Sequence, residues 1–239
     1  MTTSTDPRRN ALLAALPPTE WRRWLPQLEH VELQLDQVLC ETGRISSHVY
    51  FPTTAVVSLL STMRNGAPAE VANVGNDGMV CVEQIMGGES TTTRAIVRIA
   101  GHGFRLPAQV MKEEFKRSST VMTLMLRYTQ ALVAQIGQLA ACNRHHTIEQ
   151  QLCRLLLSSL DHIPGSEVEM THELIGKTLG VRREGVTLSA HKLQAAGMIR
   201  YARGHISVLD RSGLEQRSCE CYGDVRAEYR RLHRQEMVA

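Results

Sequence analysis

The sequence predicts an α+β fold: an N-terminal antiparallel, jelly-roll-like β-roll, a long helix, and a C-terminal helical unit that carries a short hairpin. Three patterns support this. Short runs with alternating polarity, separated by turn residues, fill residues 28–107. Apolar residues then recur every three or four positions over residues 118–142, as on one face of a helix. Within residues 171–209, two short helical patterns flank a glycine and a hairpin pattern follows. The 239 residues suffice for two modest domains, each with its own core.

The predicted first domain covers residues 1–117. Two short helical segments, over residues 9–16 and 19–25, are expected to open it, because Pro17-Pro18 separates them and no helix continues easily through proline. The strand candidates read VELQL, HVYFPT, AVVSLLST, AEVANV, RAIVRIA and FRL, and Arg64-Asn65-Gly66 favours a hairpin between two of them. Several short strands at regular spacing are typical of an antiparallel barrel or roll.

A long helix is predicted over residues 118–146, after a short helix in the stretch PAQVMKEEFKRS. About 24 helical residues span about 36 Å, which is more than one small domain needs, so the apolar seam predicts a partner helix from a second chain. The alternative is a core helix that packs along its own domain. The predicted dimer-interface residues are Val121, Leu124, Met125, Tyr128, Leu132, Ile136 and Leu139.

The predicted last domain, residues 147–239, contains a helix-turn-helix. Thr171 is suited to capping a first short helix, and Gly180 permits the sharp turn at its end, because positive φ costs glycine little. A second helix is expected over residues 182–196. A hairpin over residues 199–209, turning at Arg203-Gly204, would form a wing. Asp210 is suited to capping the helical remainder of the chain.

The stretch LIGKTLGVRREGVTLSAHKLQAAGMIRYARGHISVLD resembles the DNA-binding domain of the Crp/Fnr family of bacterial transcription regulators. The resemblance implies a homodimer with a cyclic-nucleotide-binding-like sensor roll, a dimerisation helix and a winged helix-turn-helix. Its partners would be a nearly palindromic double-stranded DNA operator and RNA polymerase. Two recognition helices about one DNA turn apart would bind that operator.

The resemblance also assigns DNA contacts to the second helix and the wing. Arg183 and Glu184 match residues that many family members use on base edges, where arginine binds guanine and glutamate accepts from cytosine. Thr187 lies at the same end of the helix, while Leu188 stands where many relatives have a second base-reading arginine. Arg182 stands where a serine would cap the helix, so the operator need not match the family's best-known half-site. The residues expected to contact phosphate are Arg182, Lys192, Arg200, Arg203 and His205.

The sensor roll is not expected to bind cyclic AMP. Family members that bind cyclic nucleotides carry a Gly-Glu pair for the ribose, whereas this chain has Gly78-Met79, and methionine cannot accept a ribose hydroxyl. Arg94 follows a threonine run and could bind an anion, although an arginine in a strand is more often solvated or ion-paired. The predicted effector-pocket residues are Asp77, Gly78, Met79, Thr91, Thr92, Thr93, Arg94 and Tyr128. They would bind an unknown small molecule, or none.

Most of the six cysteines are expected to be small buried hydrophobes rather than a disulfide framework or a metal site. Family iron-sulfur sensors use an N-terminal cysteine cluster, but no cysteine precedes Cys40. Haem would need an axial ligand such as His48, but an isolated histidine in a strand is usually structural. Cys219 and Cys221 would point about 200° apart on a helix, with nothing to complete a ligand set, so packing is favoured over metal binding. The same interpretation applies to His145-His146. No metal or cofactor is therefore predicted.

The composition excludes a membrane protein, because no apolar run approaches the roughly 18 residues of a span and the N-terminus lacks an apolar signal core. A cytoplasmic location is predicted. The formal charge is only +3, yet residues 171–209 hold six lysines and arginines against two acids, where phosphate contact is expected.

The sequence thus predicts a homodimeric, sequence-specific transcription regulator with an allosteric roll. A ligand-independent regulator with a purely structural roll is the first alternative, and a thiol-based redox sensor is the second. A redox enzyme is disfavoured, because no base, oxyanion site or glycine-rich loop accompanies the thiols, and the chain is predicted not to be an enzyme. The effector, the operator, the regulated genes and the direction of regulation stay open.

Overall fold

The computed structural model describes residues 5–88 and 90–234. The chain divides into two compact units, the first formed by residues 1–59 and 73–132, the second by residues 60–72 and 133–239. The division falls inside the long helix, between residues 132 and 133, rather than at its ends. The domain limits at residues 117 and 146 remain predictions.

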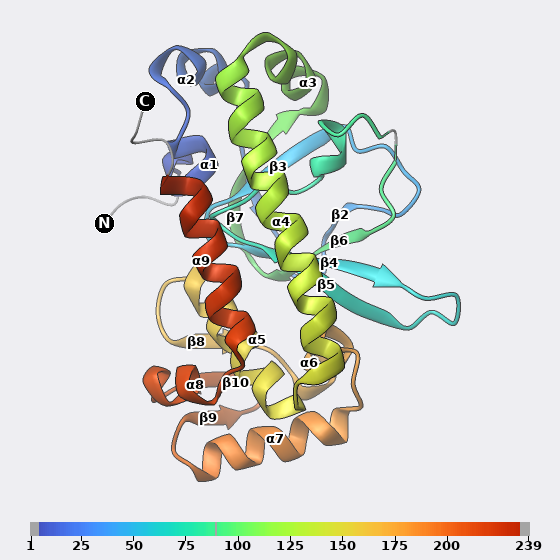
Figure 1. Cartoon of the computed structure of the whole chain (residues 1–239), viewed down its shortest axis with the longest axis vertical. Coiled ribbons are helices and arrows are strands. Elements are labelled where there is room, and N and C mark those ends of the chain that lie inside the picture. The colour runs from blue at the N-terminus through green and yellow to red at the C-terminus, as the bar shows by residue number, and fades with distance from the viewer. Residues whose placement is uncertain (1–4, 89, 235–239) are drawn as a thin grey trace. The chain divides into compact units, whose positions relative to one another are not determined.

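The roll predicted for the first domain is present as two antiparallel sheets (Figure 1). One sheet has the order β1-β7-β3 and the other β2-β6-β4-β5. Their strands are β1 (Glu29–Leu33), β2 (Val38–Cys40), β3 (His48–Pro52), β4 (Val56–Thr62), β5 (Pro68–Val74), β6 (Arg94–Ile99) and β7 (Gly101–Pro107). All the predicted strands are found within two or three residues, while β2 is additional. Gly66 has a φ of 84° in the turn between β4 and β5, as the hairpin prediction requires.

Short helices precede the roll: η1 (Pro7–Arg9), α1 (Ala11–Ala14), α2 (Pro18–Trp24) and η2 (Leu25–Gln27), and η3 (Val82–Gln84) follows β5. Asn10 attaches this segment to the roll. The oxygen of its side-chain amide caps α1, while the side-chain Nδ2 donates to the backbone carbonyls of Pro52 and Gly78 at 2.9 and 2.8 Å. A fully buried side chain is tolerated there because every polar atom is bonded.

The long helix α4 (Ser119–His145) follows α3 (Ala108–Arg117) and has 27 residues, close to the predicted range. Six of the seven predicted dimer-interface side chains are buried in the chain's own core, and Ile136 is half-buried. Their assignment to a dimer interface stays a prediction, although a side chain already covered by its own chain offers little surface to a second one. The exposed large apolar side chains on α4 are Met122, Leu126 and Val133, with exposed fractions of 38%, 53% and 59%.

The second unit contains the predicted winged helix-turn-helix (Figure 1). Its helices are α5 (Ile148–His162), α6 (His172–Leu179), α7 (Arg183–Ala195), α8 (Arg211–Arg217) and α9 (Glu220–Arg234). Strands β8 (Glu167–Glu169), β9 (Ile199–Ala202) and β10 (His205–Val208) form a sheet in the order β8-β10-β9. A capping box at Thr147 begins α5, and the Asp210 carboxylate caps α8 as predicted. The predicted helical end of the chain beyond residue 234 lies outside the described residues.

Two cysteines depart from the prediction. Cys40 at the end of β2 and Cys81 before η3 form a disulfide across a sequence separation of 41 residues, with Cα atoms 6.5 Å apart. The expectation of a chain without disulfides is therefore wrong for this pair, because linear spacing carried no sign that β2 and the Cys81 turn meet. The free cysteines are Cys142, Cys153, Cys219 and Cys221, and all four are buried.

Across the described residues, the structure contains no helix with the length and apolar character that a membrane crossing requires.

Candidate nucleic-acid interface

Three residues set the angle between α6 and α7, and the sequence had marked two of them, Thr171 and Gly180. The Thr171 hydroxyl accepts a hydrogen bond from the Leu174 amide at 3.1 Å and begins α6. Gly180 ends it with a φ of 67°, a conformation that favours glycine. At Gly176, an added Cβ would come within 3.0 Å of the Val181 carbonyl oxygen, so only glycine lets the chain pass this closely. The turn prediction is confirmed.

Helix α7 has one buried and one exposed face. Val186, Ala190 and Leu193 are buried with exposed fractions of 3% or less. The opposite face leaves Arg183 and Glu184 exposed, together with Leu188, His191 and Lys192. His191 was missed by the sequence analysis, although its position seven residues after Glu184 puts it on the same helical face.

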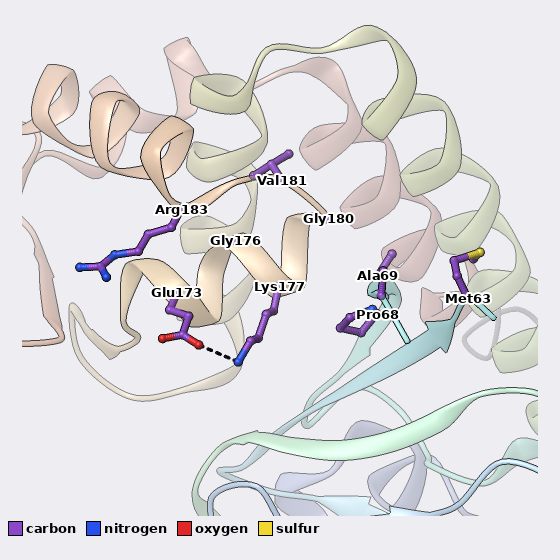
Figure 2. A pocket seen from close by; sticks show the side chains of 10 residues that line it. Met63, Pro68, Ala69, Glu173, Gly176, Lys177, Gly180, Val181 and Arg183 are labelled. Atoms are coloured by element: carbon purple, nitrogen blue, oxygen red, sulfur yellow. Dashed lines mark ion pairs between the residues drawn. The ribbon is translucent and has the colours of Figure 1, made fainter. Parts of the chain in front are cut away.

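Glu173 forms its ion pair within α6, with Lys177, although the charge of Arg183 at the start of α7 also acts on its carboxylate. Figure 2 shows Glu173 paired with Lys177, with an Oε1–Nζ distance of 2.8 Å, while the Arg183 side chain extends separately. These three residues line a shallow hollow of about 490 Å³ beside the turn, together with Met63, Ala67, Pro68, Ala69, Gly176, Gly180 and Val181. Arg183 therefore keeps an exposed guanidinium at the N-terminal end of α7.

Thr187 is held inside the winged domain more than the sequence suggested. Its hydroxyl donates to the Arg183 carbonyl at 3.0 Å and lies 3.0 Å from Nδ1 of His172. Because the hydroxyl hydrogen is used, the His172 ring donates through Nδ1. His172 stacks on Tyr201 of the wing with ring centroids 4.1 Å apart. Burial, and after it the charge of Arg183, lowers the pKa of His172, so the ring is neutral at pH 7.

The wing turns at Arg203 and Gly204, whose φ values of 49° and 87° both lie in the left-handed region. Such a pair makes the tight turn that the hairpin prediction required. The side chains of Arg200, Arg203 and His205 are exposed along the wing. All three side chains are therefore accessible to a DNA phosphate.

Lys192 and Arg182 differ in their surroundings. The Lys192 Nζ lies 3.8 Å from a Glu149 carboxylate oxygen, and Arg217 binds the same carboxylate at 3.2 Å, so Lys192 is partly neutralised. Arg182 is exposed and occupies the N-cap position of α7 without a side-chain capping bond. This agrees with the observation that an arginine replaces the expected capping serine.

The predicted effector-pocket residues separate into two groups in the first unit. Tyr128 of α4 donates a hydrogen bond to the Met79 carbonyl at 2.6 Å, and both side chains are buried. A Cβ added at Gly78 would come within 2.8 Å of the Tyr128 side chain. Burial raises the pKa of Tyr128, on which the nearby Asp77 carboxylate acts in the same direction. These four residues form a packed contact between α4 and the Gly78 turn.

The second group lies at the start of β6. The Thr91 hydroxyl is 3.1 Å from the Thr93 hydroxyl, while Thr92 is exposed. The Arg94 Nε donates to a Glu41 carboxylate oxygen at 3.1 Å. Arg94 is thus ion-paired, which is the simpler of the two interpretations weighed from the sequence.

Comparison with known proteins agrees with this geometry. Residues 150–217 match the family model of the Crp-like helix-turn-helix domain, while no curated protein matches the chain. A putative transcriptional regulator of the Crp/Fnr family from Eubacterium rectale is similar in structure, with a TM-score of 0.68 at 17% identity, over 86% of this chain and 96% of that one.

Two further solved structures are similar over both units. FixK2 from Bradyrhizobium japonicum has a TM-score of 0.69 at 15% identity and covers 80% of this chain and 98% of its own. A transcriptional regulator of the CRP family from Thermus thermophilus has a TM-score of 0.65 at 16% identity, over 79% of this chain and 96% of its own. The resemblance predicted from the sequence is confirmed, by the domain match for residues 150–217 and by the shared fold for the rest.

Proposed function

Because residues 150–217 form a Crp-like helix-turn-helix domain within the fold of Crp/Fnr regulators, we propose that this protein is a homodimeric, sequence-specific DNA-binding regulator of transcription. The observation that carries the proposal is the exposed face of α7, where Arg183 and Glu184 lie at the helix end that enters a major groove in this motif. Exposed Arg200, Arg203 and His205 on the wing supply charge for the flanking phosphates.

Each side chain on α7 has a matching base chemistry. Arg183 can donate twice to guanine O6 and N7, and Glu184 can accept from cytosine N4. Leu188, with 61% of its surface exposed, is suited to the methyl group of thymine rather than to a hydrogen-bonding base edge. The preferred half-site therefore contains a G·C pair opposite Arg183. At the position that faces Leu188 it favours thymine, whereas an arginine there would select guanine.

The dimer is proposed to form through the exposed apolar side chains of α4. Met122, Leu126 and Val133 recur at spacings of four and seven residues, which keeps them on one helical face. Pairing two such helices would remove an apolar stripe from water and set two α7 helices about 34 Å apart, one DNA turn. A nearly palindromic operator follows from the two-fold symmetry.

The roll is proposed to act on DNA binding through α4, with RNA polymerase as the downstream partner. Tyr128 supports this coupling, because it joins α4 directly to the backbone at Met79. A small molecule other than cyclic AMP, bound near Gly78 and Tyr128, would move that contact and bias the dimer between two states.

Two observations favour the ligand-independent alternative. The space at Gly78 is filled by the Tyr128 ring, and Arg94 is already paired with Glu41. Titration calorimetry with cyclic AMP separates the proposals from a cyclic-nucleotide sensor: no heat of binding is expected at millimolar nucleotide. Saturable binding of cyclic AMP that tightens operator affinity would contradict both the proposal of a different ligand and that of a ligand-independent roll.

The DNA proposal is tested by selecting bound fragments from genomic DNA and measuring affinity for the operator and for a scrambled duplex. Arg183→Ala is expected to lose about 1–3 kcal/mol of discrimination between the two. Arg44→Ala removes an exposed arginine from the first unit and should leave both affinities unchanged. Equal discrimination by Arg183→Ala and the unmodified protein would refute the assignment.

Wing charges predict a different response. Arg200→Ala should weaken binding to every sequence and reduce the slope of log affinity against log salt by about 0.9 for each subunit, or about 1.8 for the dimer. Unchanged salt dependence, with the fold retained, would mean that Arg200 contacts no phosphate.

The dimer proposal is tested by sedimentation of Leu126→Glu and Val133→Glu. Both should shift the protein toward monomer, because each buries a carboxylate in the proposed interface. Leu35→Glu, at another exposed leucine, is the matched control and should sediment as the unmodified dimer. A monomeric unmodified protein at micromolar concentration would sink the proposal.

A further inference from the structure

Three of the free cysteines lie close to one histidine in the second unit. None of these four residues belongs to α7. Cys142 lies in the last turn of α4 and His146 follows its end, while Cys219 and Cys221 flank the first residue of α9. Cys142, Cys219 and Cys221 have exposed fractions of 0%, 4% and 1% and form a cluster of their own. One ligand atom from each of the four residues lies within 4.8 Å of all the others.

We propose that Cys142, His146, Cys219 and Cys221 form a Cys₃His site for a thiophilic divalent metal ion of the zinc class. The name Cys₃His site is used below for these four residues. Three sulfurs and one imidazole nitrogen are the donor set of closed, structural zinc sites, and this set leaves no open position for substrate.

Two of the separations between ligand atoms match those around a tetrahedral ion, and all of them lie within 4.8 Å. Metal–sulfur bonds of about 2.3 Å at the tetrahedral angle put two sulfurs about 3.8 Å apart, and a sulfur and a nitrogen about 3.6 Å apart. Sγ of Cys142 and Sγ of Cys219 are 3.6 Å apart, and Sγ of Cys221 is 3.5 Å from Nδ1 of His146. Cys142 and Cys219 are therefore not joined by a disulfide in this structure, and their sulfurs lie at the separation that a shared ion requires.

Helix geometry explains why four residues converge. Cys142 and His146 are four positions apart, so both point to one side of the end of α4. Cys219 precedes α9, which begins at Glu220, so the helical angle of about 200° between Cys219 and Cys221 does not apply. The prediction that nothing completes a ligand set around this pair was made from spacing alone. Tertiary packing supplies the two missing ligands.

Outer contacts orient the ligands as they do around structural metals. Nε2 of His146 lies 3.3 Å from a Glu220 carboxylate oxygen, which fixes the ring proton on Nε2 and leaves the Nδ1 lone pair facing Cys221. The Gln138 amide donates to the Cys221 sulfur at 3.2 Å, a bond that holds this sulfur in place.

A buried positive charge stands near the site. Arg154 is 4% exposed, and its Nε is among the buried polar atoms of the described chain that lack a hydrogen-bond partner. Arg154 is close enough for its charge to act on Cys142. Three thiolates and a neutral imidazole on a divalent ion carry a net charge of −1, which this guanidinium would offset. Binding releases one proton from each thiol.

The test uses the full chain, purified without a tag and kept reduced, with Co²⁺ as the probe and Zn²⁺ as the competitor. One equivalent of Co²⁺ per chain should give sulfur-to-cobalt charge-transfer absorption and the visible bands of a tetrahedral ion, and Zn²⁺ should abolish both. Cys142→Ser, Cys221→Ser and His146→Gln should lose stoichiometric binding. Cys153→Ser, at a buried cysteine outside the Cys₃His site, should keep it.

A variant that spares the ligands keeps the test decisive if a cysteine variant does not fold. Glu220→Gln at an exposed carboxylate should retain the fold and weaken metal binding 10- to 100-fold, the usual effect of removing an outer partner. The proposal is overturned if the reduced protein binds no Co²⁺, if the ligand variants bind as tightly as Cys153→Ser, or if the protein isolated from metal-sufficient cells carries a Cys142–Cys219 disulfide. DNA affinity is measured separately, so failure here leaves the proposed regulator intact.

Discussion

Two regions of the second unit, the helix-turn-helix and the proposed Cys₃His site, are organised in opposite ways. The helix-turn-helix, residues 171–195, is built from neighbours in the sequence and presents exposed charge. The Cys₃His site is built from two segments over 70 residues apart and is buried. Short-range signals such as a cap and a left-handed glycine predict the first region. For the second region, single cysteines signal nothing until packing brings them together.

The largest effect is expected at the buried face of α7. Leu193→Ala should lower the free energy of unfolding by about 3 kcal/mol, because it leaves a cavity at a fully buried position. Urea denaturation measures this loss. Leu188→Ala, on the exposed face of the same helix, should change stability by less than about 0.5 kcal/mol and alter only operator preference. Equal losses would mean that α7 does not have one buried and one exposed face.

Metal removal is expected to have the next largest effect, and it follows from the proposed Cys₃His site. Metal at about 100 times its dissociation constant would contribute about 2.7 kcal/mol, so a chelator should lower the unfolding temperature of the metal-loaded protein. Differential scanning calorimetry with and without chelator makes the measurement. Cys142→Ser, which lacks a ligand, should show no chelator effect. If it responds as the unmodified protein does, the metal lies elsewhere.

The local cap of α6 should contribute less. Thr171→Ala removes the hydroxyl that accepts from the Leu174 amide, and a loss of about 1 kcal/mol in unfolding free energy is expected. Thr171→Ser keeps a capping oxygen and should restore most of that stability. If serine and alanine are equally destabilising, the hydroxyl does not act as a cap.

The smallest effect concerns pH and His172 beneath α7. The folded pKa of His172 lies below its ordinary value near 6.5 because of burial and Arg183, with His191 acting in the same direction. At this position the unfolded chain therefore binds a proton more readily than the folded chain does. The contribution of neutral His172 to the unfolding free energy is present above pH 6.5 and is lost as the pH falls below it. His172→Phe should keep the stacking on Tyr201 and flatten the dependence of unfolding free energy on pH. His191→Gln should keep most of that pH dependence. If His172→Phe has the same pH profile as the unmodified protein, His172 is not the group responsible for it.

The long helix shows why the dimer face could not be predicted from periodicity. Val121, Leu124 and Tyr128 recur at helical spacing, and so do Met122, Leu126 and Val133. Each set can serve as an apolar seam, and hydrophobic spacing alone does not say which seam the chain's own core covers. In the structure the first set is buried and the second is exposed, so the expected partner surface changes although the helix itself was predicted correctly.

The sequence by itself determined the elements whose causes lie within a few residues. Thr171, Gly180 and Arg203-Gly204 specify caps and turns through their own side chains and backbone preferences, and the alternating runs specify the strands of the roll. Only the tertiary structure decided that Cys40 bonds to Cys81, that Cys142 and His146 meet Cys219 and Cys221, and which side of α4 is exposed. These outcomes depend on distances between segments remote in the chain, and such distances result from packing the whole core rather than from any local pattern.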